Sequence, residues 1–149
     1  MKIILAILAL AAAAFYSNST SKKTELVGTW RTRVVHQGVE VLGTLNLKES
    51  GEIVFKGEMT PLDPALYIVG CVGPDGRPAR TFSFEARGEW SVRFSNLVAK
   101  FRETNPRCSL PMDDLYGGKI ASIDLRKLVL HPRRERDRPP GMETETWYR

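Results

Sequence analysis

The chain has 149 residues, of which 22 are basic and 17 acidic, for a formal net charge of +5. This modest excess keeps a protein soluble, but it does not indicate a nucleic-acid-binding surface. The length allows one domain with a hydrophobic core of its own.

The first residues are typical of a secretory signal peptide. Met1-Lys2 gives a positive start, and the run from Ile3 to Phe15 carries no charge. That run is shorter than the roughly 20 apolar residues of a membrane-spanning helix, although an uncleaved anchor is the alternative. We therefore predict a signal peptide over residues 1–19, a single domain over 20–149, and export from the cytoplasm.

The two cysteines, Cys71 and Cys108, form an even number in a chain that we expect to be exported. A disulfide bond between them is the expected arrangement. On the chain-entropy model it would stabilise the fold by roughly 3–4 kcal/mol. A redox-active or metal-binding pair is the alternative, but the two residues lack the close spacing of such sites.

The first predicted strand covers residues 26–35. Alternation places Trp30 on one face with Gly28 and Val34, whereas Arg31 and Arg33 fall on the opposite, solvated face. Gly28 leaves room beside the indole. We therefore expect Trp30 to be buried against the first and last strands, where it would plug one end of a barrel.

The rest of the chain continues as short alternating segments separated by turn signals, and no segment after the first residues has a helical period. The predicted strands are 39–48, 53–58, 81–85, 88–94, 97–102, 119–124, 127–131 and 142–149, with 66–71 as a short strand or a buried crossing segment. Two longer loops are expected at 104–118 and 132–141. The pattern predicts an all-β, antiparallel up-and-down barrel or sandwich of about eight to ten short strands.

Three motifs resemble those of bacterial lipocalin-like proteins, which are small exported barrels of the calycin type. They are Leu26-Val-Gly-Thr-Trp30, Gly88-Glu-Trp-Ser-Val92 and the closing segment Leu128-Val-Leu130…Thr144-Glu-Thr-Trp-Tyr-Arg149. The resemblance implies a lipocalin-like β-barrel, a periplasmic or secreted location in a bacterium, and a binding role. The long 104–118 loop and the charged 132–141 loop depart from the pattern of that family.

Catalytic residues are not evident. His36 and His131 are the two histidines, and we expect both to be solvated surface residues. Asp113-Asp114 lacks the ligand spacing of a calcium loop. No nucleophile elbow, phosphate-binding loop or zinc-binding helix motif is present. We predict no catalytic residue, no metal site and no cofactor.

Aromatic side chains dominate the positions predicted to face inward. An eight-stranded barrel is wide enough either to be filled by side chains or to hold one small ligand. A packed core is one interpretation, and an apolar ligand site is the other. The candidate ligand-binding residues are Trp30, Phe55, Phe82, Phe84 and Trp90.

Three functions are compatible with these observations. The first is binding of a small hydrophobic or amphipathic ligand in a barrel that is open at one end. The second is binding of an envelope protein, for example as an inhibitor of an exported enzyme, through the 104–118 or 132–141 loop. The third is hydrolysis at a polar cleft that holds His36 or His131 beside a carboxylate. We expect a monomer without a nucleic-acid partner or a stable membrane span.

Overall fold

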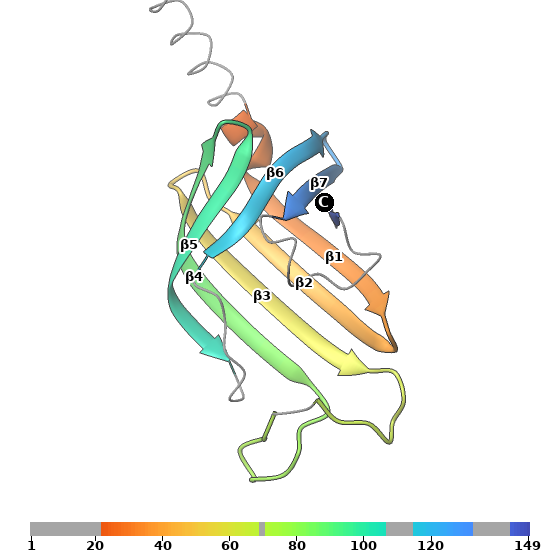
Figure 1. The fold of residues 1–149 in the computed structure, drawn as a ribbon. Helices are drawn as coiled ribbons and strands as arrows, with labels where there is room; N and C mark the ends of the chain where they lie inside the picture. Colours follow the sequence, from red (N-terminus) through yellow and green to blue (C-terminus); the bar gives the residue numbers. More distant parts are fainter. Residues whose placement is uncertain (1–21, 69–70, 107–114, 133–143) are drawn as a thin grey trace, which may run out of the picture.

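A computed structural model describes residues 22–68, 71–106, 115–132 and 144–149. Its regular elements are a helical turn over residues 22–26 and eight strands. The strands are β1 (Gly28–His36), β2 (Val39–Leu47), β3 (Glu52–Pro61), β4 (Phe82–Arg93), β5 (Asn96–Pro106), β6 (Leu115–Ile123), β7 (Lys127–Pro132) and β8 (Glu145–Tyr148) (Figure 1).

The eight strands form a closed antiparallel barrel in which each strand pairs with its neighbours in the sequence, and β8 returns to pair with β1. The predicted all-β up-and-down barrel is therefore confirmed. Because β8 pairs with β1, the first and last strands do not leave a free sheet edge at the point where they meet.

The long hairpins of β1 to β3 follow from alternation and turn chemistry. The β1–β2 turn places Gln37 and Gly38 at φ 47° and 76°, the left-handed pair that matches the twist of a tight hairpin. The resulting register puts Leu45 opposite Trp30 and Phe55. As predicted, the odd-numbered residues of β2 and β3 face inward, and Leu45, Leu47 and Ile53 are buried.

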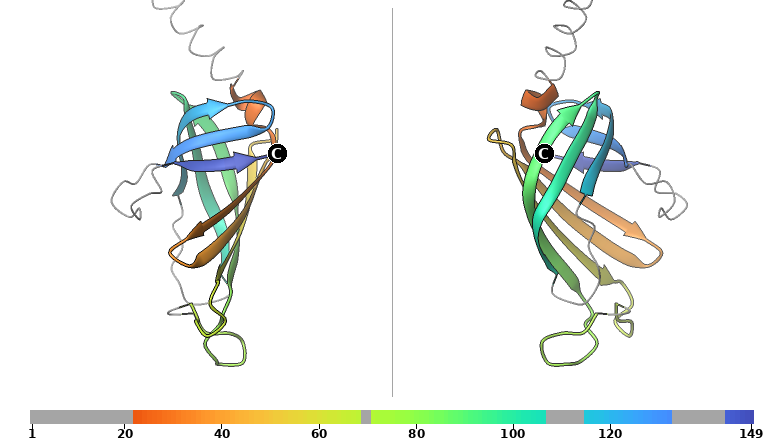
Figure 2. Two further views of the ribbon diagram at one scale, coloured as in Figure 1. Left: turned by 90° about the vertical axis from the view of Figure 1, so that its right-hand side faces the viewer. Right: turned by 60° about the vertical axis from the view of Figure 1, so that its left-hand side comes forward.

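The barrel is closed over only part of its length. Pairing of β5 with β6 runs from Asn96 to Lys100, and β8 meets β1 through one register pair, Arg31 and Tyr148. Strands β1 to β4 continue past the level at which β6 to β8 lie (Figures 1 and 2). We call the half that contains β6 to β8 the closed half, and the extension of β1 to β4 the open half.

Trp30 lies in the closed half, next to the helical turn of residues 22–26. Its ring is fully buried, and its Nε1 donates a hydrogen bond of 2.8 Å to the carbonyl oxygen of Leu26. The guanidinium of Arg149 stands 4.3 Å from the ring centroid. It also donates hydrogen bonds to the carbonyl oxygens of Glu25 and Val27. The predicted burial of Trp30 at one barrel end is confirmed.

Several predicted boundaries are wrong. The predicted strands 81–85 and 88–94 are one strand, β4; opposite Arg87 and Gly88 the ladder is irregular, because Arg102 of β5 is skipped in the register. The predicted 104–118 loop is shorter, because β5 extends to Pro106 and β6 begins at Leu115. Residues 66–68 and 71 are not in a strand; beside them, Val72 forms an isolated bridge with Pro78.

The alternation of the predicted strand 88–94 places Phe94 on the inward face of Trp90, and this prediction is wrong. Phe94 lies in the β4–β5 turn with φ 49° and is 85% exposed. The side chain of Asn96 stabilises this turn by donating hydrogen bonds to the carbonyl oxygens of Arg93 and Phe94.

Two other predictions involve residues outside the described ranges. The predicted signal peptide covers residues 1–19, which lie outside the described ranges. Cys71 is buried, but Cys108 also lies outside the described residues, so the disulfide bond between them stays a prediction. None of the described helical residues forms a helix long and apolar enough to cross a membrane.

Candidate functional site

A cluster of aromatic rings fills the barrel interior where the closed half meets the open half. Phe55 lies at its centre, with ring centroids of Tyr116 at 4.9 Å, Phe84 at 5.1 Å, Trp147 at 5.8 Å and Phe101 at 6.1 Å. Edge-on and tilted ring pairs at such distances add to the energy of apolar burial. We call these five residues the aromatic cluster.

Two glycines make room for the cluster. Gly43 on β2 and Gly57 on β3 are register partners on the inner face. A Cβ added at Gly57 would overlap the ring of Phe84, and one at Gly43 would lie 2.9 Å from the Trp147 ring. These rings therefore lie against the backbone of the two glycines, where a larger residue would displace them.

A carboxylate lies among these rings. Tyr116 donates a 2.7 Å hydrogen bond from its hydroxyl to Oε2 of Glu145, and Nε1 of Trp147 lies 3.3 Å from the same oxygen. None of these three residues was among the candidate site residues predicted from the sequence. Alternation in Glu145-Thr-Trp147 puts the carboxylate on the face of the buried indole, and this signal could have identified it.

Desolvation inside the barrel, followed by the negative charge and the hydrogen bond of Glu145, raises the pKa of Tyr116 well above its usual value of 10. A group whose pKa is raised on folding stabilises the fold below its unfolded pKa and loses that contribution as the pH rises toward the folded pKa. We therefore expect the free energy of unfolding to fall above about pH 10.

Urea titrations between pH 8 and pH 11 measure this fall. Tyr116→Phe keeps the ring and removes the ionisable group, so the variant should lose less stability over the alkaline range. Tyr148→Phe is the matched control, because Tyr148 is 52% exposed, and it should follow the wild-type curve. Identical curves for Tyr116→Phe and the wild type would contradict the assignment.

The five predicted ligand-binding residues separate into two groups. Trp30 and Trp90 lie in the closed half, where Nε1 of Trp90 donates a 3.0 Å hydrogen bond to the carbonyl oxygen of Lys48. Phe55 and Phe84 belong to the aromatic cluster, and the ring of Phe82 lies 5.7 Å from that of Phe84. The two tryptophans are buried within the closed half. Of the five residues, the three phenylalanines lie toward the open half.

The inner face of the open half remains partly exposed. We call it the inner apolar face; its members are the half-buried side chains of Val34, Val39, Val41 and Met59. His36 shares this side of β1, and its Nε2 is buried with no hydrogen-bond partner among the described residues. The expectation that His36 is a solvated surface residue is therefore wrong, whereas His131 is exposed as expected.

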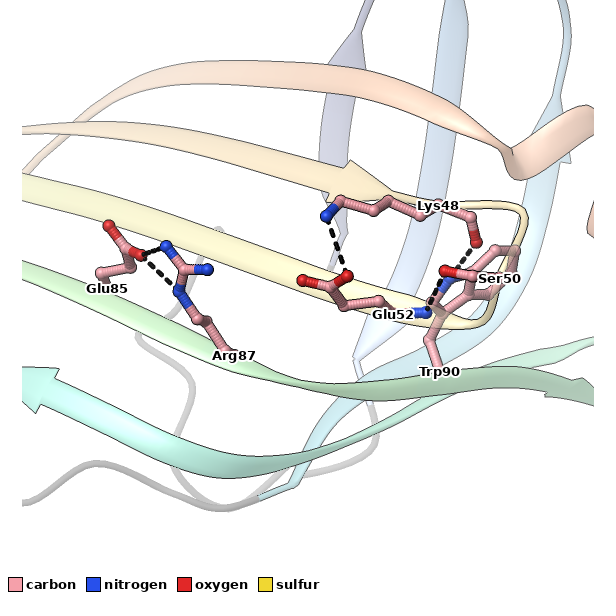
Figure 3. Close-up of polar contacts among 6 residues, drawn as sticks. All are labelled: Lys48, Ser50, Glu52, Glu85, Arg87 and Trp90. Carbon is pink, nitrogen blue, oxygen red and sulfur yellow. Dashed lines mark hydrogen bonds and ion pairs between the residues drawn. The ribbon is translucent and has the colours of Figure 1, made fainter.

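The outer face of the same strands is charged. Two shallow grooves of about 430 Å³ each follow β2 to β4 and β3 to β5. Several of their charged side chains form ion pairs with neighbours, such as Glu52 with Lys48 and Arg87 with Glu85 (Figure 3). A hydrogen bond from Lys56, which has the larger effect, and one from Arg87 lower the pKa of Glu85. Exposed pairs of this kind contribute little to stability.

The described residues contain no group of three or more metal-ligating side chains. Nε2 of His36 contacts no carboxylate among them, so it does not form the pair that hydrolysis at this histidine requires. A search against protein-family models and a search of curated proteins both found no match for the sequence.

Proposed function

We propose that the protein is an exported, lipocalin-like binding protein that holds a small amphipathic ligand on the inner apolar face, against the aromatic cluster. The observation that carries this proposal is the contrast between the two halves of the barrel interior. In the closed half inward side chains such as Trp30, Leu45 and Leu128 are fully buried, whereas the members of the inner apolar face in the open half keep part of their surface in solvent.

An apolar surface that is partly wet gains free energy when a ligand covers it, at about 25 cal/mol per Å² of apolar area buried. Apolar side chains together with a few polar groups form the usual lining of small-molecule sites. Here the inner apolar face supplies the first and the Tyr116–Glu145 pair supplies the second. The lipocalin-like motifs of the sequence agree with such a role.

Fluorescence of the neutral apolar probe N-phenyl-1-naphthylamine tests the proposal. Val41 and Leu42 are neighbours on β2, but Val41 faces inward and Leu42 faces outward at 39% exposure. Val41→Asp places a carboxylate beside the bound probe and should weaken binding about tenfold or more. Leu42→Asp, the matched control, should bind the probe like the wild type. Equal effects of the two variants, or no binding by the wild type, would overturn the proposal.

Binding of another protein is the second candidate function, and one observation favours it. The segment after β3 carries four side chains that are each about half exposed despite being apolar or aromatic: Leu62, Leu66, Tyr67 and Val72. An exposed group of this kind is typical of a protein-contact surface. A wild-type protein that does not bind the probe would favour this second role.

A further inference from the structure

The geometry points to a specific class of ligand: an amphipathic organic cation, with an apolar body on the inner apolar face and an ammonium group at Glu145. This inference rests on the proposed function and adds the charge of the ligand to it.

Glu145 is a carboxylate without a positive partner. It is half-buried on the inner side of β8, and its two hydrogen bonds come from neutral donors, the hydroxyl of Tyr116 and the indole of Trp147. Among the described residues no lysine, arginine or histidine forms an ion pair with it. The attraction between a carboxylate and a bound cation is stronger at a half-buried position than in bulk water.

One oxygen of this carboxylate is available. Both hydrogen bonds end on Oε2, so Oε1 accepts none from the described residues. Among the described residues, Nε2 of His36 is the one side-chain polar atom that is buried and has no hydrogen-bond partner. Since Oε1 of Glu145 also lacks a partner there but is not such a buried atom, it is accessible to solvent. The carboxylate is therefore held in place through one oxygen and offers the other to a ligand.

The surroundings of Glu145 are aromatic. Tyr116 and Trp147 reach its Oε2 with a hydroxyl and an indole N–H group, and the ring of Phe55 lies within 6 Å of both rings. The long-range field of the protein opposes a cation, since the net charge of +5 attracts anions. A preference for cations would therefore have to come from Glu145.

Three ligands with alkyl tails of seven or eight carbons separate these effects: octyltrimethylammonium, octanol and octanoate. Each is titrated against the protein in competition with N-phenyl-1-naphthylamine. We expect the wild type to bind octyltrimethylammonium about tenfold or more tightly than octanoate. Glu145→Gln keeps the shape and an acceptor oxygen for Tyr116 but removes the charge. It should abolish the preference for the cation and leave the affinity for octanol unchanged, which also shows that the variant is folded.

Glu58→Gln is the matched control, because Glu58 is an exposed carboxylate on the outer side of β3, and it should keep the preference. Tyr116→Phe should keep it too, since the carboxylate remains. If octanol and octanoate bind and the cation binds no more tightly, the inference about Glu145 fails and the proposed function stands. If none of the three ligands binds, the proposed function fails as well.

Discussion

Replacing Trp30 with alanine should destabilise the barrel by about 3–5 kcal/mol, a large part of the 5–15 kcal/mol that stabilises a typical domain. The indole is fully buried, and its removal leaves a cavity between β1 and the helical turn of residues 22–26. It also leaves the carbonyl oxygen of Leu26 without its donor and takes the ring from beneath the guanidinium of Arg149.

Arg33→Ala is the matched control on the same strand. Its side chain is 75% exposed, and its ion pair with Glu40 crosses the outer face, so the substitution should cost well under 1 kcal/mol. Urea denaturation of the two variants gives the comparison. A midpoint for Trp30→Ala close to that of the wild type would show that the indole does not hold the closed half together.

Gly118→Ala should be nearly as damaging, at about 3 kcal/mol or more. Gly118 lies on β6 opposite Pro132 of β7, and the backbones approach so closely that a Cβ would overlap the carbonyl oxygen of His131. That Cβ would also lie 2.7 Å from the carbonyl carbon of His131. These neighbours are backbone atoms, so β7 would have to move away from β6.

Gly38→Ala separates this steric effect from conformational strain. Gly38 has φ 76°, which an L-residue adopts at a cost of about 1–2 kcal/mol, but nothing lies within 4 Å of an added Cβ. We expect its urea midpoint to fall less than that of Gly118→Ala. The opposite order would mean that the β6–β7 contact relaxes easily.

Strands with clear alternation could be predicted from the sequence. The prediction was wrong where glycines that resemble turn residues lie within a strand. Leu45 and Leu47 alternate with polar residues, so their strand and inner face were predictable. Gly117 and Gly118 resemble loop residues in the sequence, yet both are buried in β6. They are glycines because the backbones of β5 and β7 lie close on either side, and that proximity is a tertiary property.

The candidate site was only partly predictable for the same reason. Alternation identified Phe55 and Phe84 as inward-facing, but it could not show that Phe55 packs against Tyr116, whose hydroxyl bonds to Glu145. Tyr116 and Glu145 are 29 residues apart, and the closure of the barrel brings them together. No local pattern encodes that closure, because it depends on the register of the whole set of strands.

The single register pair between β1 and β8 has a dynamic consequence. Along the strands, this seam includes the register pair of Arg31 with Tyr148 and a hydrogen bond from the hydroxyl of Thr32 to the carbonyl oxygen of Thr146, and Arg149 adds contacts to Trp30 and Val27 at one end. Local opening begins where the fewest hydrogen bonds must break together. Thermal fluctuations should therefore part the barrel along this line while the nine-pair ladder of β1 and β2 stays intact. Glu145 and Trp147 lie on the strand that would swing away, so a ligand would have a side entrance to the aromatic cluster.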